Sequence, residues 1–424
     1  MSLSFPDSMR RSSWPRAALG VGLAGALAFS GAAPVMPAHA AQTHWQPRFE
    51  TGVEQNTNRN LAVDPDLEAD VAGYIATAEV LWSYVTPRTD TQVQPRLRFQ
   101  RYPDQDDADR TEQFLDFSTA HRATERTDYE LVARYSRQDA FRTELGEAEF
   151  DDFDPEDPTD GGEGAAIFGA DTRTRVQLRP GLTHQYSELT GIEVGGVAET
   201  VRYQSDILDR ADFDYFEARA LLTRQHTPRT RWSGGPMVSR YETKDGRNQT
   251  DDIGVELGVN HAWSELMQFG GGVFVRRSDI EIIRETVIGT ETQTNYGFDI
   301  NMIRRTELGR VRLSIGRRLR PTSVGAMTTT DELRVQYDHD FTQRVSMRTA
   351  LRAYSQESVG TFAGGDGDRD YARGELRLTW MWTPTIYIRG DYQYTWRDVA
   401  RDATSADNHA VMVSVGYRGL ARPH

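Results

Sequence analysis

Arginine is the residue of this sequence that is best suited to binding chemistry. Lys244 is the only lysine among the 49 basic residues, and arginine supplies the rest. A guanidinium group binds carboxylates and phosphates through paired hydrogen bonds. Arginines at every second position would share one face of an extended strand and would favour anions in a water-filled space. The candidate pore-lining residues of this kind are Arg96, Arg98, Arg173, Arg175, Arg179, Arg310, Arg312, Arg348, Arg352, Arg373 and Arg377.

Internal ion pairing is the alternative use of these arginines. Acidic residues occur on the same hydrophilic phase of the predicted strands, and pairing with them would brace the interior without any ion preference. The register between neighbouring strands decides which arginines stay unpaired, so both interpretations remain open. The candidate acidic partners are Glu130, Glu217, Glu332, Asp338, Glu375 and Asp391.

The sequence indicates no metal, cofactor or nucleic acid. It contains no cysteine, which excludes disulfides, thiolate metal sites and cysteine nucleophiles. Gly364–Asp368 resembles one calcium-binding turn, but that chemistry needs tandem copies, and Asp152–Glu163 lacks the spacing of an EF-hand loop. The formal net charge of −14 and the lack of a phosphate-binding glycine loop argue against nucleic acid and nucleotide partners.

Histidine placement argues against an enzyme. A membrane-embedded hydrolase would need a nucleophile, a histidine and an acid that meet in one pocket. Five histidines instead share the apolar phase of their predicted strands, near the strand ends. We therefore predict no catalytic residues and no enzymatic activity. These histidines are His121, His184, His261, His339 and His409.

The elements that would position the arginines are amphipathic β-strands. In Thr91–Arg101, apolar residues such as Leu97 and Phe99 alternate with hydrophilic residues such as Arg98. This period of two recurs along most of the chain, yet no segment resembles a covering helix or a strand that is apolar on both faces. The apolar face must therefore contact lipid, and we predict an all-β, transmembrane, antiparallel up-and-down barrel.

The spacing of these segments predicts about eighteen strands, with sixteen or twenty as alternatives. Long and short gaps alternate, as in outer-membrane barrels with long external loops and short periplasmic turns, so both mature ends are expected on the periplasmic side. Two strands, 191–203 and 232–241, are rich in glycine and change phase, which suggests bulges. The predicted long gaps include 243–251 and 279–293.

Large aromatic residues near the short gaps predict a membrane girdle. Rings with a polar edge collect at membrane interfaces, whereas packing in a core would place tryptophans mid-strand. The predicted girdle residues are Trp45, Trp82, Trp232, Trp263, Trp380, Trp382 and Tyr417.

The first forty residues read as a secretory signal. Arg10, Arg11 and Arg16 precede an apolar run of small residues that Pro34 ends, and Ala38-His39-Ala40 resembles a cleavage site. We therefore predict a signal peptide over 1–40 and an outer-membrane barrel over 41–424.

Acidic residues gather in the predicted external gaps, at Asp104–Asp107 and between Glu144 and Glu163. Such runs are usually solvated, and the alternatives are binding of cations that bridge lipopolysaccharide or folding inward against arginines. The gap at 140–171 is long enough for a constriction or lid. Eighteen strands enclose a cylinder roughly 35 Å across, so a water path or a plug must fill its middle.

Two segments resemble a known family. The stretch from Phe49 to Arg59 is similar to a Gly-x-x-x-Asp-x-Asn opening, with Gln55 in place of the acid, and Val411–Tyr417 resembles the final-strand signal read by the barrel assembly machinery. Arg418–His424 follow where such chains usually stop. On these residues, the mature chain resembles bacterial outer-membrane β-barrel porins, specifically the exopolysaccharide-associated type.

The resemblance implies passage or anchoring of an extracellular polysaccharide, or passive diffusion of small solutes. We predict a Gram-negative outer-membrane pore whose arginine-lined lumen passes anionic solutes or exports a polysaccharide. Its expected partners are the lipid bilayer, lipopolysaccharide and the barrel assembly machinery. The alternative is a plugged barrel that acts as a non-conducting envelope scaffold or receptor.

Overall fold

A computed structural model describes residues 41–59, 61–62, 68, 70–103, 109–140, 171–204, 210–284, 287–322, 327–358, 369–399, 404–420 and 422–423. All of them belong to one compact unit, Ala40–His424. The predicted signal peptide over 1–40, the acidic run at Asp104–Asp107, most of the 140–171 gap and Gly364–Asp368 lie outside the described residues.

Nineteen strands form a single sheet. They are β1 (Gln42–Asn56), β2 (Val71–Val85), β3 (Thr89–Arg101), β4 (Arg110–Thr124), β5 (Thr127–Asp139), β6 (Thr172–Gln185), β7 (Thr190–Tyr203), β8 (Phe213–Thr227), β9 (Thr230–Thr243), β10 (Asn248–Ser264), β11 (Met267–Arg284), β12 (Val287–Thr306), β13 (Gly309–Pro321), β14 (Met327–Asp340), β15 (Val345–Ser358), β16 (Arg369–Met381), β17 (Ile386–Val399), β18 (Thr404–Arg418) and the two-residue β19 (Arg422–Pro423).

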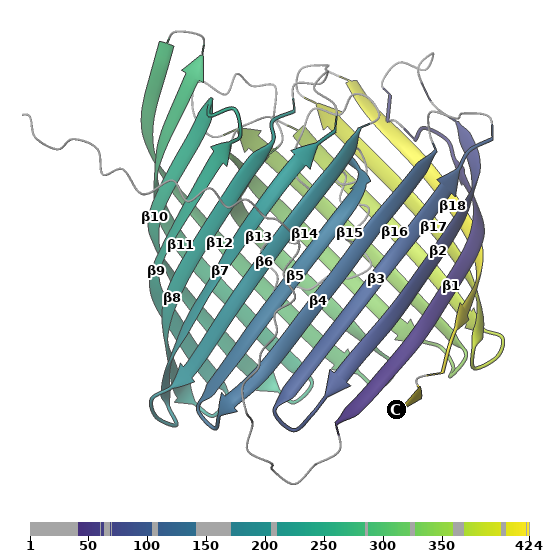
Figure 1. Cartoon of the computed structure of the whole chain (residues 1–424), viewed down its shortest axis with the longest axis horizontal. Coiled ribbons are helices and arrows are strands. Elements are labelled where there is room, and N and C mark those ends of the chain that lie inside the picture. Colours follow the sequence, from purple (N-terminus) through teal and green to yellow (C-terminus); the bar gives the residue numbers. More distant parts are fainter. Residues whose placement is uncertain are drawn as a thin grey trace, which may run out of the picture. The chain divides into compact units, whose positions relative to one another are not determined.

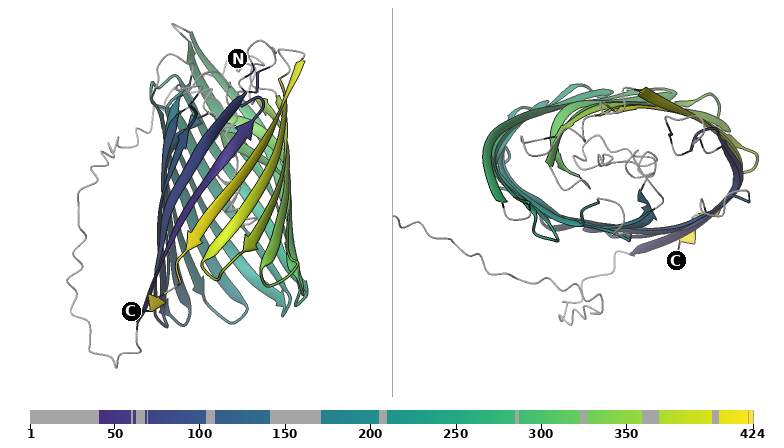
Figure 2. Two further views of the ribbon diagram at one scale, coloured as in Figure 1. Left: turned by 90° about the vertical axis from the view of Figure 1, so that its right-hand side faces the viewer. Right: turned by 90° about the horizontal axis from the view of Figure 1, so that it is seen from above.

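The sheet closes into a ring because its first and last long strands pair. β1 and β18 are antiparallel neighbours from Arg48 opposite Arg418 to Asn56 opposite Ala410. Every other long strand pairs with the strands before and after it in the chain, and β19 adds a short pairing to the start of β1. Figures 1 and 2 show the tilted strands and the closed ring. The predicted closed, antiparallel barrel of about eighteen strands is confirmed.

The two faces of the barrel differ in polarity. On β18, Val411 and Val413 are about half exposed on the outside, at 50% and 51%, whereas Ser414 faces inward and is 2% exposed. The same alternation places apolar side chains outside and polar side chains inside on the other long strands. An outer belt of this kind is stable against hydrocarbon. The fold is therefore a transmembrane up-and-down β-barrel.

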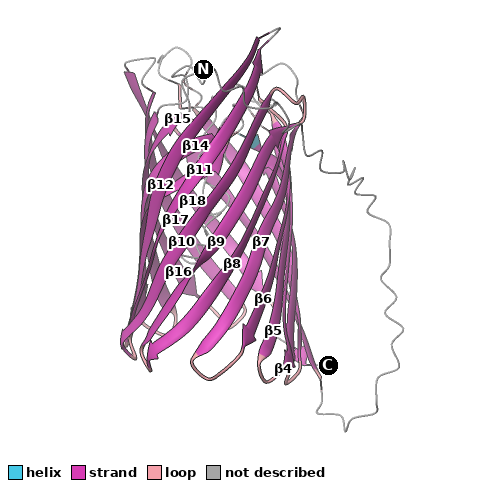
Figure 3. Cartoon of the chain, turned by 90° about the vertical axis from the view of Figure 1, so that its left-hand side faces the viewer, coloured by secondary structure: helices cyan, strands magenta, loops and turns pink. Residues whose placement is uncertain are grey.

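Short turns occupy one edge of the barrel, the lower edge in Figure 3. Each of the eight turns has a Ser or Thr at or next to its start, and in seven of them its hydroxyl accepts a backbone N–H from two or three residues further on, at 2.9–3.3 Å. Such bonds hold a tight turn closed. These residues are Thr86, Thr124, Ser187, Thr227, Ser264, Thr306, Thr342 and Thr383.

Both described ends of the barrel lie at this turn edge. Gln42 pairs with Val85, which directly precedes a short turn, and the Arg418 N–H donates to the Thr385 carbonyl. No described helix has the length and the apolar composition that a bilayer-spanning helix needs.

The predicted long gap at 279–293 is wrong. β11 continues to Arg284, which pairs with Val287 on β12. In this region Ile280 faces inward and Glu281 faces outward, the reverse of the alternation in the apolar belt. Water would wet the outer face above the membrane, so a strand there keeps its polar residues outside and reads as a loop in the sequence.

The same reversal corrects two further predictions. Only Lys244–Arg247 separate β9 from β10, so most of the gap predicted at 243–251 is strand. β7 and β8 pair without a register shift, and the one shift between β8 and β9 lies at their turn, so the predicted bulges are absent from these described strands. The change of phase arises because inner residues such as Val201 and Tyr241 become apolar near the loop edge.

Candidate functional site

Inward-facing arginines gather in one cavity of the lumen, which we call the vestibule. It has a volume of about 540 Å³ and is lined from β1–β3 and β13–β18. Nine arginines and four carboxylates line it, so cations are in excess. They are Arg48, Arg96, Arg98, Arg310, Arg312, Arg348, Arg377, Arg389 and Arg418, with Glu50, Glu79, Asp338 and Asp340.

The structure places all eleven sequence-predicted arginines on the inner phase of their strands, and it brings six of them together in the vestibule. The other five lie elsewhere on the inner wall. Those five are Arg173, Arg175, Arg179, Arg352 and Arg373.

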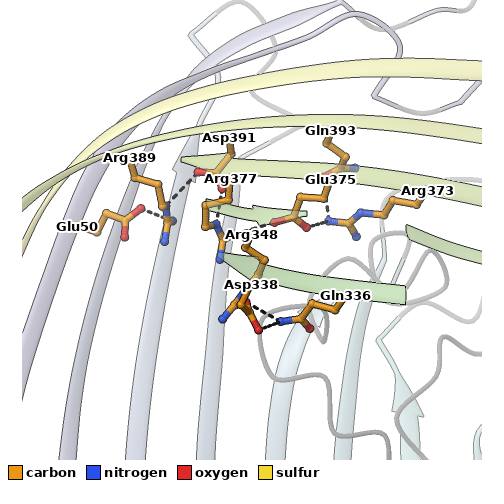
Figure 4. Close-up of polar contacts among 10 residues, drawn as sticks. All are labelled: Glu50, Gln336, Asp338, Arg348, Arg373, Glu375, Arg377, Arg389, Asp391 and Gln393. Atoms are coloured by element: carbon orange, nitrogen blue, oxygen red, sulfur yellow. Dashed lines mark hydrogen bonds and ion pairs between the residues drawn. The ribbon is translucent and has the colours of Figure 1, made fainter. Parts of the chain in front are cut away.

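A chain of ion pairs crosses the vestibule wall from β1 to β16 (Figure 4). Arg389 pairs with Glu50 and lies 3.0 Å from Asp391. Arg377 lies 2.5 Å from Asp391 and 3.1 Å from Glu375. Each carboxylate therefore neutralises arginines on neighbouring strands, and the chain holds the guanidinium groups in fixed positions.

Asp338 organises the next part of the wall. Its carboxylate accepts from Arg312 at 3.0 Å and from Arg348 at 2.8 Å. Arg348 lies directly opposite Arg377 in the strand register. Two like charges in this position repel each other, so they depend on the carboxylates beside them. The negative charge of an anionic solute bound here would reduce the repulsion between these two arginines.

Three vestibule arginines have no carboxylate within 4 Å in the described part of the chain, Arg96, Arg310 and Arg418. The Arg96 guanidinium lies over the Phe114 ring at 4.4 Å, which holds it by a cation–π contact. Pairing and excess charge therefore coexist, so neither alternative from the sequence describes the whole lumen.

Glu332 is the centre of a separate, buried cluster, which lies further from the turn edge than Asp338 on the same strand. Its oxygens accept from Arg334 and Arg352 at 2.7 Å and lie 3.3 Å from Arg320. Sequence reasoning missed Arg320, Arg334 and Arg389. The signal was available for Arg334, because it shares the inner phase of β14 with Glu332.

Of the remaining predicted arginines, Arg373 lies on β16, 3.5 Å from Glu375, and the other three lie on β6. Arg175 donates to Glu199 on β7 at 2.7 Å, and Arg173 is 2% exposed. Arg179 faces the lumen from the same strand. These three are not part of the vestibule.

The end of β13 and the start of β14 turn into the lumen. β13 pairs with β12 only from Gly309 to Arg317, and its last residues pair with β14 alone. Leu319 and Met327 from this hairpin join a buried apolar cluster with inner-wall residues that include Tyr241. The Tyr241 hydroxyl donates to the Thr322 carbonyl at 3.3 Å. The hairpin therefore narrows the lumen.

Part of the β1–β2 connection also enters the barrel. Leu61 is fully buried and packs with Tyr354, Tyr371 and Ala406. Its carbonyl accepts from Arg397 on β17 at 2.7 Å. A second segment therefore narrows the lumen beside β15–β18.

The predicted girdle residues lie on the outside near the turn edge. Trp232 is 53% and Trp263 68% exposed, and Trp82 pairs in register with Trp45. Three of the outward histidines accept or donate a hydrogen bond at Nδ1 with a threonine of the adjacent strand at 2.9–3.0 Å. The residues of this outer rim include Trp45, Trp82, Trp232, Trp263, Trp380, Trp382 and Tyr417.

Comparison with known proteins gives structural likeness only. No protein-family profile and no curated protein matches this chain. Among solved structures, OccAB3 of Acinetobacter baumannii is 11% identical with a TM-score of 0.45, over 90% of this chain and 99% of that one. OccK2 (OpdF) of Pseudomonas aeruginosa, solved in complex with glucuronate, is 11% identical with a TM-score of 0.42, over 90% and 98%.

The ferric-catecholate import receptor Fiu of E. coli K12 is 9% identical with a TM-score of 0.45, over 90% of this chain and 82% of that one. At these identities and scores, the likeness carries no conclusion about the solute, the partners or the activity of this chain.

Proposed function

We propose that this protein is an outer-membrane pore through which small anionic solutes diffuse. The observation that carries the proposal is the vestibule, where nine arginines face four carboxylates in one water-accessible cavity. A cleft lined by one sign of charge concentrates counter-ions and raises their rate of entry. The mechanism is passive and involves no covalent step.

The outer membrane is the proposed location. An apolar outer belt with aromatic residues at the turn edge fits a bilayer, and the predicted signal peptide would direct export. Both described ends of the barrel would then lie in the periplasm, with the longer connections outside. Lipopolysaccharide and the barrel assembly machinery are the proposed partners.

Solute capture at the vestibule follows from the two kinds of arginine there. Paired arginines such as Arg348 and Arg377 are held in place by carboxylates, so they form a fixed positive surface. Arg96 and Arg310 lack such a partner among the described residues and would bind the solute carboxylate or phosphate directly. An acidic polysaccharide carries the same groups, so its export stays a second version of this proposal.

A plugged barrel is the second candidate function. The inward β13–β14 hairpin and the buried Leu61 support it, because both reduce the free cross-section. In that case the protein would act as a non-conducting scaffold or receptor.

Planar-bilayer recording of the refolded, full mature chain tests the proposal. We expect stable conductance steps and, under a salt gradient, a reversal potential that indicates anion preference. Silence in repeated insertions, with correct folding verified by heat-modifiable gel migration, would support the scaffold. Cation preference would contradict the anion pore.

A further inference from the structure

A second cavity occupies another side of the lumen. Its volume is about 710 Å³, and it shares no lining residue with the vestibule. Its wall comes mainly from the inner faces of β7–β12, and the hairpin residues Arg318–Pro321 lie at its edge. Figure 1 places these strands side by side, and their register is continuous in this region.

Glycines form the floor of this cavity and allow two asparagines to converge. Gly270 on β11 lies between Asn260 on β10 and Asn301 on β12. A Cβ atom at Gly270 would lie 2.4 Å from the Asn301 Oδ1 and 2.7 Å from the Asn260 Oδ1. Both amide groups therefore bend over the glycine from opposite sides, and a side chain at this position would push them apart.

The next row of the register repeats this arrangement. Gly258 and Gly272 lie side by side, with Ser233 beyond the first and Asp299 beyond the second. A Cβ atom at Gly272 would lie 2.8 Å from the Asp299 Oδ1, and one at Gly258 would lie 2.7 Å from the Ser233 Oγ. Two amides, a carboxylate and a hydroxyl thus surround the floor, where Gly258 and Gly272 line the cavity and the two amides lie over Gly270.

These polar groups are available to a ligand. Within the described ranges, the side chains of Asn260, Asp299 and Asn301 make no hydrogen bond and no ion pair, and all three line the cavity. In contrast, Glu217 elsewhere in the cavity lies 3.1 Å from Arg276. The cavity is lined by seven arginines and five carboxylates, and four arginines pair with four of these carboxylates. The two asparagines and Asp299 are therefore uncommitted donors and acceptors beside largely paired charges.

An aromatic ring borders the same floor. Phe274 faces inward one row above Gly272, and its ring lies over Gly297 on β12. A Cβ atom at Gly297 would lie 2.2 Å from the ring. The Arg276 guanidinium also lies over this ring, 4.8 Å from its centre, so one face of the ring is occupied. What the recess offers a ligand is chiefly amides that both donate and accept hydrogen bonds.

We propose that this glycine-floored recess binds a neutral, hydroxyl-rich solute such as a sugar unit. Each sugar hydroxyl donates and accepts a hydrogen bond, which matches the amides of Asn260 and Asn301, and the Asp299 carboxylate accepts from a further hydroxyl. This site goes beyond the proposed anion pathway, because it lies apart from the vestibule and selects for hydroxyl groups.

Binding of maltotriose to the full mature chain, folded in a sugar-free detergent, tests this site. Saturation-transfer NMR and calorimetric titration report binding whether or not the barrel conducts, so failure of the pore proposal stays distinguishable. We expect saturable binding. Replacement of two amides, N260A with N301A, is expected to weaken binding at least about tenfold, because each removes a hydrogen bond.

Two further variants complete the test. Gly270→Ala keeps every polar group but forces the two amides apart, so it is expected to cause a similar loss. Gln92→Ala removes an inward amide on β3 outside both cavities and serves as the matched control. Absence of saturable maltotriose binding to the folded wild-type chain, or equal affinity in G270A and the wild type, would overturn the proposal.

Discussion

Individual arginines in the lumen differ in the contacts that fix their guanidinium groups. Arg377 lies between two carboxylates, whereas Arg96 is held by the Phe114 ring and has no carboxylate within 4 Å among the described residues. A paired guanidinium keeps only part of its attraction for a solute, because its partner already satisfies some of its donors. Ion preference should therefore depend most on the arginines without such a partner.

We predict that replacing both Arg96 and Arg310 with glutamate lowers the anion-to-cation permeability ratio by at least about threefold, because the field in the vestibule changes sign at two positions. Reversal potentials in a salt gradient measure this ratio. Arg247→Glu makes one such charge reversal in an exposed outer turn; it is the control and should leave the ratio nearly unchanged. An unaltered ratio in the double variant would place the permeation path elsewhere.

Glu332 should matter for stability, since its carboxylate is buried with Arg320, Arg334 and Arg352. We predict that Glu332→Gln lowers the free energy of unfolding by about 3 kcal/mol, because it removes the negative charge that three buried arginines share. Urea unfolding in lipid vesicles measures the change. The exposed pair of Asp245 and Arg247 gives the comparison, and Asp245→Asn should cost under about 1 kcal/mol.

At the scale of elements, the same alternation of apolar and polar side chains occurs in two opposite orientations. In the apolar belt the hydrophobic phase points outward, whereas near the loop edge Ile280 and Tyr241 carry it inward. The short turns show a more local rule, since each has at or next to its start a Ser or Thr whose hydroxyl suits a tight turn. That repeated signal is visible in the sequence and went unrecognised there.

The inward β13–β14 hairpin is the element expected to limit flow. We predict that replacing 319–328 with a two-residue turn raises single-channel conductance, because it removes Leu319 and Met327 from the lumen. Bilayer recording measures the step size. Shortening the outer turn at Lys244–Arg247 is the control, and steps of equal size in the two variants would show that the hairpin does not restrict the path.

At the scale of the whole molecule, ring closure decides where every face points. Pairing of β1 with β18 joins the two edges of the sheet, so neither of these long strands is left with an unpaired edge facing lipid. Closure also brings the inner faces of the last strands next to that of the first strand. Arg389 on β17 therefore pairs with Glu50 on β1. The barrel and its charged interior therefore form together.

We predict that the tryptophans near the turn edge lie at a membrane interface. Trp232 and Trp263 are more than half exposed on the outer surface, and their rings should reach the headgroup region. In vesicles, lipids brominated close to the headgroup should quench tryptophan fluorescence more than lipids brominated near the chain end. If neither brominated lipid quenched the tryptophan fluorescence, this surface would not contact the bilayer.

The sequence alone determined the barrel, the strand number, the inner phase of all eleven arginines and the outer position of the aromatic residues. These are local properties, because the period of two assigns each side chain to a face without knowledge of its neighbours. The predictions of long gaps at 243–251 and 279–293 were wrong, because a strand that extends beyond the membrane has its polar face outside and its apolar face inside.

Only the tertiary structure decided which charges meet. Glu50 and Arg389, or Glu332 and Arg352, come from different strands, and a shift of register would give each a different partner. The inward hairpin and the convergence of Asn260 and Asn301 over Gly270 likewise depend on contacts between strands. Side-chain direction follows from the nearest residues in the chain, whereas partners follow from how the closed sheet aligns its rows.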